Sequence, residues 1–252
     1  MNRRHALCGL CALPAQALAL EQAAPAIPAG TLRIACIQKD IEAWVARQML
    51  AAIYAQAGLV LLPEMMPPMR ASVALVAGDV DGELMRPLSY EAEHPELVRV
   101  PTPFYRVSVQ AYSLLARKVR IELPDDLKRY DVGSVHGLAV VRELLAKWRP
   151  RQNASAVNHE QLCRMLKAGR VDAAVDTRLR MLNMLNFLQI KDTVASPELA
   201  RFDLFHFLHR RNAEHTARLD ETIRRMSNNG ELERLFNLNL RLSMKMTPAQ
   251  FD

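Results

Sequence analysis

A turn between a predicted strand and a predicted helix supplies the first candidate for ligand chemistry. Residues 133–137 (GSVHG) follow a short apolar segment and come just before a segment with helical spacing. Free amides at the start of a helix suit a carboxylate or a phosphate, and the side chains of Ser134 and His136 could add hydrogen bonds. The alternative is an ordinary turn between a strand and a helix.

A second group of polar residues lies at the end of a predicted strand over residues 80–84. Asp81 and Glu83 alternate with Gly82 and therefore share one face of that strand. In doubly wound sheets ligands bind at the carboxyl ends of the strands, so we expect Glu83 and Arg86 to face a ligand. Arg86 could hold a carboxylate through two parallel hydrogen bonds. The alternative is an internal ion pair between Glu83 and Arg86.

The elements that must position these residues alternate between strand and helix. In the first half we expect strands at 32–37, 59–62 and 80–84, with helices over 41–57 and 69–76. In the second half we expect strands at 131–135, 154–157 and 171–175, with helices over 138–148, 158–167 and 179–188. This order predicts an α/β fold with parallel strands and right-handed crossovers.

Two extended segments, 105–115 and 202–209, flank the second α/β unit. Two crossings between units make the first lobe discontinuous and the second lobe an insertion in it. The expected division is lobe 1 at 20–113 and 203–252 and lobe 2 at 114–202. A ligand cleft is expected between the lobes, because interfaces between domains favour pockets. Tyr105 could form an aromatic wall of that cleft, with packing in the core as the alternative.

Residues 1–19 have the anatomy of a bacterial secretory signal, and a buried N-terminal helix is the alternative. Arg3 and Arg4 precede an apolar run that is too short to span a bilayer. Ala17-Leu18-Ala19 fits a small-x-small cleavage site, so we expect cleavage after Ala19. The paired arginines leave the general secretory and the twin-arginine routes open. The mature chain is therefore expected in the periplasm.

Composition excludes several classes of protein. Half of the 252 residues are hydrophobic and 24% are charged, which excludes a disordered, collagenous or disulfide-scaffold chain. The net charge of +6 suggests nucleic acid, but the arginines of the C-terminal region alternate with acids at helical spacing, which is typical of a solvated helix face. Beyond the signal, Cys36 and Cys163 are expected as buried thiols, with a disulfide as the alternative. No cysteine or histidine cluster has metal-ligand spacing, so we expect no metal or cofactor.

Six short phrases follow one another along the chain: residues 32–35 (LRIA), 77–82 (AGDVDG), 101–105 (PTPFY), 130–137 (YDVGSVHG), 166–175 (LKAGRVDAAV) and 229–232 (NGEL). In this order they resemble the type 2 periplasmic solute-binding proteins, in particular the family 3 kind that serve amino-acid importers. The resemblance implies a Venus flytrap: two α/β lobes that are joined by two hinge strands and close on a ligand.

The resemblance also bears on individual residues. It implies that Asp176, at the end of the strand 171–175, holds the amino group of a ligand, with capping of the next helix as the alternative. Amino-acid binders of this kind also carry a Thr-x-x-Arg step after the third strand, whose arginine holds the ligand carboxylate. Residues 89–94 contain no arginine. A standard α-amino acid is therefore in doubt as the ligand.

Three functions are compatible with these expectations. The first is a monomeric receptor that captures a small polar ligand, anionic or amino-acid-like, for an inner-membrane permease such as an ABC transporter. The second is an orphan sensory or accessory module that binds without transport. The third is an enzyme such as a periplasmic dehydratase, in which His136 and Glu83 would act as acid and base.

Overall fold

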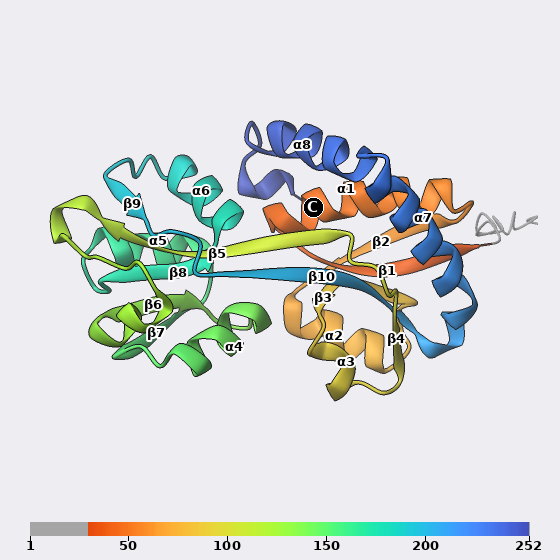
Figure 1. The fold of residues 1–252 in the computed structure, drawn as a ribbon, viewed down its shortest axis with the longest axis horizontal. Helices are drawn as coiled ribbons and strands as arrows, with labels where there is room; N and C mark the ends of the chain where they lie inside the picture. The colour runs from red at the N-terminus through yellow and green to blue at the C-terminus, as the bar shows by residue number, and fades with distance from the viewer. Residues whose placement is uncertain (1–29, 252) are drawn as a thin grey trace, which may run out of the picture.

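One continuous mixed sheet passes through both halves of the molecule in the computed structural model, which describes residues 30–251 (Figure 1). Its strands are β1 (Thr31–Ile37), β2 (Val60–Met66), β3 (Gly82–Pro87), β4 (Leu97–Arg99), β5 (Tyr105–Leu114), β6 (Asp131–Val135), β7 (Gln152–Ala156), β8 (Ala173–Thr177), β9 (Thr193–Ala195) and β10 (Ala200–His209). Their order is β2-β1-β3-β10-β5-β8-β6-β7, with β4 beside β10 and β9 beside β5. The expected signal at 1–19 lies outside the described residues.

Helices cover both faces of this sheet. They are α1 (Ile41–Gln56), α2 (Pro68–Val76), α3 (Tyr90–Glu93), α4 (Ala139–Trp148), α5 (His159–Lys167), α6 (Arg178–Phe187), α7 (Thr216–Asn228) and α8 (Glu231–Ser243), with 3₁₀ turns at Leu115–Arg117, Pro124–Arg129, Arg210–His215 and Pro248–Gln250. No helix of residues 30–251 is long and apolar enough to cross a membrane.

Lobe 1 consists of β1–β4 with α1, α2, α3, α7 and α8 (Figure 1). Strands β1, β2 and β3 are parallel, as the strand–helix alternation predicts. Helix α1 begins at Ile41 because the side chain of Asp40 accepts a hydrogen bond from the Ala43 amide, and it ends before Gly58, whose φ is +65°. Its apolar face packs with α7 and α8 on one side of the sheet, while α2 and α3 cover the other side.

Lobe 2 consists of β6–β9 with α4, α5 and α6 (Figure 1). Strand β6 is parallel to both β7 and β8. Helix α5 is capped by the side chain of Asn158, which accepts a hydrogen bond from the Gln161 amide. The lobe has its own hydrophobic core, separate from that of lobe 1. Cys36 and Cys163 lie in different lobes as free, buried thiols, which confirms the preferred prediction for them.

Two long antiparallel strands, β5 and β10, join the lobes and cross the middle of the molecule side by side (Figure 1). Strand β10 pairs with β3 in lobe 1, and β5 pairs with β8 in lobe 2. The side chains of Tyr105 and Val107 belong to the core of lobe 1, whereas those of Val109 and Ala111 belong to the core of lobe 2. Core packing therefore passes from one lobe to the other within β5, and the lobe limits at residues 113 and 203 stay predictions.

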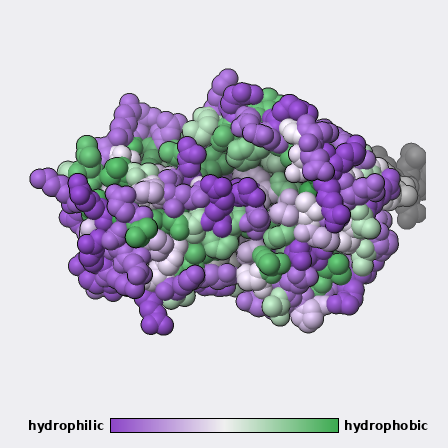
Figure 2. Space-filling model, in the orientation of Figure 1, coloured by the Kyte–Doolittle hydropathy of each residue, from purple (hydrophilic) through white to green (hydrophobic). Residues whose placement is uncertain are grey.

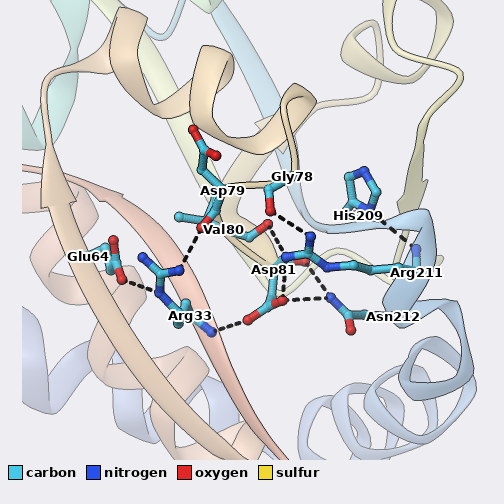
Figure 3. Close-up of polar contacts among 9 residues, drawn as sticks. All are labelled: Arg33, Glu64, Gly78, Asp79, Val80, Asp81, His209, Arg211 and Asn212. Carbon is cyan, nitrogen blue, oxygen red and sulfur yellow. Dashed lines mark hydrogen bonds and ion pairs between the residues drawn. The ribbon is translucent and has the colours of Figure 1, made fainter.

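Asp81, the residue before β3, connects three segments of lobe 1 through hydrogen bonds (Figure 3). It lies at the amino ends of the parallel strands, away from the edge formed by their carboxyl ends. Its carboxylate accepts hydrogen bonds from the Arg33 amide at 2.8 Å, from Arg211 at 2.7 Å and from the Asn212 side chain at 3.1 Å. Burial raises the pKa of Asp81, but these donors outweigh it and hold the pKa below its usual value. The residue is a structural anchor, as its place in the phrase 77–82 indicates.

Asp81→Asn should lower the free energy of unfolding by about 2 kcal/mol, because the amide keeps only one acceptor oxygen, turns its NH2 group toward the other donor and loses the charge that pairs with Arg211. Urea denaturation at neutral pH measures this effect. The matched control is Asp203→Asn, which removes the exposed partner of Arg106 and should cost less than about 1 kcal/mol. Equal losses in the two variants would contradict the anchoring role of Asp81.

His206 on β10 is fully buried and links the hinge strand to lobe 1. Its Nδ1 lies 2.8 Å from the Glu83 carbonyl oxygen, which can only accept, so Nδ1 carries the proton. Its Nε2 then accepts a hydrogen bond from the Tyr54 hydroxyl at 2.7 Å. Burial lowers the pKa of His206 to about 4, and the carbonyl contacts offset only part of this effect.

The titration of His206 should by itself lower the stability of the protein as the pH falls from 6.5 to 4. The unfolded chain protonates a histidine near pH 6.5, whereas His206 in the folded state resists protonation until about pH 4. In His206→Asn, whose amide keeps a donor but takes no charge, the loss between these pH values should be smaller. Urea denaturation across the range measures it. His136→Asn, at an exposed histidine, is the control and should follow the unmodified protein.

Candidate ligand-binding cleft

The carboxyl ends of strands from both lobes meet at a cleft between them. Strands β1 and β3 of lobe 1 and β6 and β8 of lobe 2 all end there, and Val107 and Leu204 of the hinge strands lie beneath. The residues that line the cleft are Ile37, Glu42, Met85, Arg86, Pro87, Val107, Gly137, Leu138, Val140, Thr177, Arg180 and Leu204. This is the edge at which α/β sheets bind ligands.

The cleft is nearly filled by the side chains of the protein. Its cavity is about 50 Å³, whereas pockets for small molecules are typically about 300 to 1,000 Å³. A second cavity of about 180 Å³ opens beside it between α2, α3 and α4, and the two share Arg86, Pro87 and Gly137. The lobes are therefore closed on one another, with space for water or a very small group.

A buried group of charges crosses the cleft. Arg180, near the start of α6 in lobe 2, points toward two acids of lobe 1. Its Nε lies 2.7 Å from Oδ2 of Asp40, and its Nη1 lies 3.3 Å from Oε2 of Glu42. Its Nη1 is also 3.9 Å from Oδ1 of Asp176, which is fully buried at the end of β8. The guanidinium is thus surrounded by carboxylates from both lobes.

The environment of these groups separates their pKa values. Burial raises the pKa of Asp40, but the charge and hydrogen bond of Arg180 outweigh burial and the net shift is downward. Burial raises the pKa of Glu42 to about 7, and Arg180 offsets only part of this rise. The pKa of Arg180 is raised, because the three carboxylates more than compensate for its burial. Asp40 and Arg180 therefore stay charged at neutral pH, while Glu42 titrates there.

Buried polar atoms without a hydrogen-bond partner gather around this cleft. Within residues 30–251 such atoms occur at Thr31 and Thr216, and at five positions in or behind the cleft: Glu42 Oε2, Arg86 Nε, His159 Nε2, Asp176 Oδ2 and Thr177 Oγ1. Three of these are within ion-pair distance of a partner but lack hydrogen-bond geometry: Glu42 Oε2 is 3.3 Å from Arg180 Nη1, and His159 Nε2 and Asp176 Oδ2 are 3.1 Å apart. Buried polar groups are normally satisfied, so such a concentration marks a site that binds polar groups.

Glu83 and Arg86 adopt the alternative that the sequence leaves open, an internal ion pair. The two side chains contact each other and are both buried on β3, between β1 and β10. Arg86 also donates to the Ser72 hydroxyl at 2.7 Å and lies 5.0 Å from the centre of the Tyr90 ring. Its charge is therefore neutralised inside lobe 1, while its Nε has no hydrogen-bond partner.

The turn after β6 reaches the cleft, but not through the side chains expected to contact a ligand. Ser134 is buried and its hydroxyl donates to the side-chain oxygen of Asn153 on β7 at 3.0 Å. His136 is exposed, and Gly137 and Leu138 line the cleft in its place. Gly137 has a φ of +84°, which turns the chain into α4.

Tyr105 and Asp176 are both buried, in different surroundings. Tyr105 packs in the core of lobe 1 against Phe236, with ring centres 5.8 Å apart, so the core-packing alternative is the arrangement found. Asp176 accepts a hydrogen bond from the Thr177 amide at 2.6 Å and lies next to Arg180 and His159. Of the six residues proposed from the sequence, Arg86 lines the cleft and Asp176 lies directly behind it.

A larger cavity lies elsewhere, between the hinge strands and α8. It measures about 430 Å³ and is lined partly by Phe104, Tyr105 and Phe236. On the face drawn in Figure 2, hydrophilic side chains lie at the centre of the molecule between hydrophobic patches. Its charged side chains already pair, as between Arg106 and Asp203 at 2.6 Å. The cleft is the better candidate for ligand binding in spite of its smaller volume, because buried polar atoms without a hydrogen bond lie there.

Asp40, Glu42, Thr177 and Arg180 are site residues that were not predicted from the sequence. Asp40 lies three residues after the end of the first strand, so the rule that ligands bind at the carboxyl ends of strands also selects Asp40. Arg180 follows Asp176 by four residues, a spacing that puts both on one side of a helical turn. The sequence could not show that Asp40 and Glu42 of lobe 1 face Asp176 and Arg180 of lobe 2 across the cleft.

Comparisons with known proteins agree on the fold. No family model and no curated protein matches the chain. Among solved structures, a histidine kinase sensor domain with similarity to periplasmic binding proteins is 17% identical, with a TM-score of 0.71 over 82% of this chain and 95% of the other. The chain has the type 2 periplasmic-binding-protein fold.

Two more structures share this fold. An amino acid ABC transporter substrate-binding protein from Streptococcus pneumoniae, bound to L-arginine, is 16% identical, with a TM-score of 0.67 over 86% of this chain and 97% of the other. An ancestral amino-acid-binding protein, a precursor of cyclohexadienyl dehydratase, is 14% identical, with a TM-score of 0.67 over 84% of this chain and 95% of the other. The periplasmic-binding-protein fold thus carries receptors, sensors and precursors of enzymes.

Glu42 should make stability depend on pH in the direction opposite to His206. Its pKa is near 4.3 in an unfolded chain and about 7 in the fold, so between these values the folded state binds more protons and stability falls as the pH rises. Glu42→Gln takes no charge, so its stability relative to the unmodified protein should rise from pH 5 to pH 8. Urea denaturation at both pH values measures the difference. The control is Glu160→Gln on α5, at an exposed carboxylate, where a pH-independent difference is expected.

Proposed function

We propose that this protein is a binding module that captures a small polar ligand between its two lobes. The observation that carries the proposal is the concentration of buried polar groups from both lobes at the cleft, among which atoms of Glu42 in lobe 1 and Thr177 in lobe 2 lack hydrogen-bond geometry. These atoms lie where the strands of both lobes end, above the two hinge strands. A ligand that pairs with them would be held from both sides.

Binding in such a module is coupled to movement of the lobes. Bending of β5 and β10 separates the Asp40–Glu42 side of the cleft from the Thr177–Arg180 side and makes room for a ligand. Closure is then driven by contacts that form only when the lobes meet. The closed cavity of about 50 Å³ implies that a ligand of ordinary size displaces side chains that now fill the cleft.

The charge of the cleft bears on the class of ligand. Carboxylates outnumber guanidinium groups here: Asp40, Glu42, Glu83 and Asp176 stand against Arg86 and Arg180. Arg86, the expected anion clamp, is already paired with Glu83. These contacts favour a polar ligand with a positively charged group over a simple anion.

Delivery of the ligand to an inner-membrane permease, by a monomeric protein in the periplasm, is the first role that we propose. A sensory module without transport is the second candidate. It is supported by the shared fold of the histidine kinase sensor domain and by a cleft that the protein fills with its own side chains. An acid–base role for His136 with Glu83 is disfavoured, because His136 is exposed while Glu83 is buried in an ion pair.

A thermal-shift screen of amino acids, small amines and dicarboxylates tests the binding function. A true ligand raises the melting temperature as its concentration rises. Thr177→Val should then weaken binding about tenfold, since it removes one cleft hydroxyl worth about 1.4 kcal/mol. Thr31→Val removes another unpaired hydroxyl, remote from the cleft, and should leave the affinity unchanged. The proposal fails if no compound shifts the melting temperature or if both variants bind equally well.

A further inference from the structure

Arg180 occupies the position between the lobes that a bound ligand would take. It belongs to α6 of lobe 2, yet its nearest partners are Asp40 and Glu42 at the start of α1 in lobe 1. Its side chain is 10% exposed, and those of Asp40 and Glu42 are 4% and 3% exposed. Water therefore competes little with these ion pairs, in contrast to those on the surface.

The acids around Arg180 are held in place before it arrives. Asp40 caps α1 through Oδ1, which accepts from the Ala43 amide at 2.9 Å, while its Oδ2 remains for Arg180. Asp176 is fixed by the Thr177 amide and adjoins His159. Carboxylates that are oriented by their own helix and strand form a rigid receptor for a planar cation.

Removal of Arg180 would leave buried carboxylates without a counter-charge. Breaking a buried pair from one side is costly because the remaining charge stays desolvated. Opening of the lobes relieves that cost, since it returns Asp40 and Glu42 to water. By contrast, the contact between Ser89 and Glu143, which also joins the lobes, is exposed and contributes little to closure.

We propose that Arg180 is a built-in ligand: its guanidinium holds the lobes closed in the absence of a solute, and the carboxylates of Asp40, Glu42 and Asp176 form a guanidinium-binding site. A solute that opens or replaces this latch competes for the same carboxylates and carries a guanidinium or ammonium group. The inference rests on the proposed function in one respect, because it assigns the ligand class of the same cleft.

Two measurements on Arg180→Ala test the latch. By small-angle X-ray scattering, the variant should have a larger radius of gyration than the unmodified protein, because its lobes separate. Methylguanidinium, which fits the space left by the truncated side chain, should restore the smaller radius and raise the melting temperature of the variant. It should change neither quantity in the unmodified protein at the same concentration.

Two further variants serve as controls. Arg178→Ala removes an exposed arginine from the same helix and should keep the compact radius without any response to methylguanidinium. Asp40→Asn retains a residue that caps α1 but loses the charge that holds Arg180. It should open the lobes as Arg180→Ala does, and it provides the test if Arg180→Ala does not fold.

The outcomes separate this inference from the proposed function. A compact Asp40→Asn or Arg180→Ala variant, or an open Arg180→Ala variant whose melting temperature methylguanidinium leaves unchanged, would overturn the latch, whatever the ligand screen shows. If the screen finds no ligand but both variants open and Arg180→Ala responds to methylguanidinium, the latch stands and the capture of a solute is wrong. A ligand without a positive charge that binds the unmodified protein with the latch intact would overturn the assigned ligand class.

Discussion

The buried guanidinium of Arg180 between the two lobes constrains the positions of the carboxylates around it and of the lobes that carry them. Arg180 can lie out of water only because carboxylates approach it from both lobes, with Asp40 at 2.7 Å as the strongest partner. Those carboxylates in turn need fixed positions, which the start of α1 and the end of β8 provide. The closed arrangement of the lobes and the small volume of the cleft follow from this one requirement.

The hinge strands allow such a contact to form and to break. Strands β5 and β10 pair with each other, β10 pairs with β3 of lobe 1 and β5 pairs with β8 of lobe 2. Each lobe has its own apolar core, and of the lobe 2 helices Leu179 of α6 and Val140 of α4 also pack against the core of lobe 1. The polar network around Asp81 holds lobe 1 rigid at the edge away from the cleft. Movement is thus confined to the place where the buried charges lie.

The interpretation of individual polar residues from sequence was right about their region and often wrong about their partners. Arg86 does lie near the end of the third strand, but Glu83 lies near its start, and the two neutralise each other inside lobe 1. Ser134 pairs with Asn153 on the neighbouring strand, a contact that depends on the order of strands in the sheet. Asp176 does lie by the cleft, where the resemblance to solute-binding proteins placed it. Spacing along the chain predicts whether a residue lies near the end of a strand. It does not predict which side chain of the other lobe contacts that residue.

The alternation of strands and helices, the burial of Cys36 and Cys163, and a fold of two lobes could be predicted from the sequence, because these depend on local periodicity and on the order of elements. The tertiary structure alone decided the site. Arg180 and Asp40 are 140 residues apart in the chain, and their contact exists only because the lobes close on each other. A buried charge needs a partner of opposite charge, because an unpaired buried charge costs too much free energy. The tertiary structure determines which residue lies close enough to be that partner, so a local sequence pattern cannot predict it.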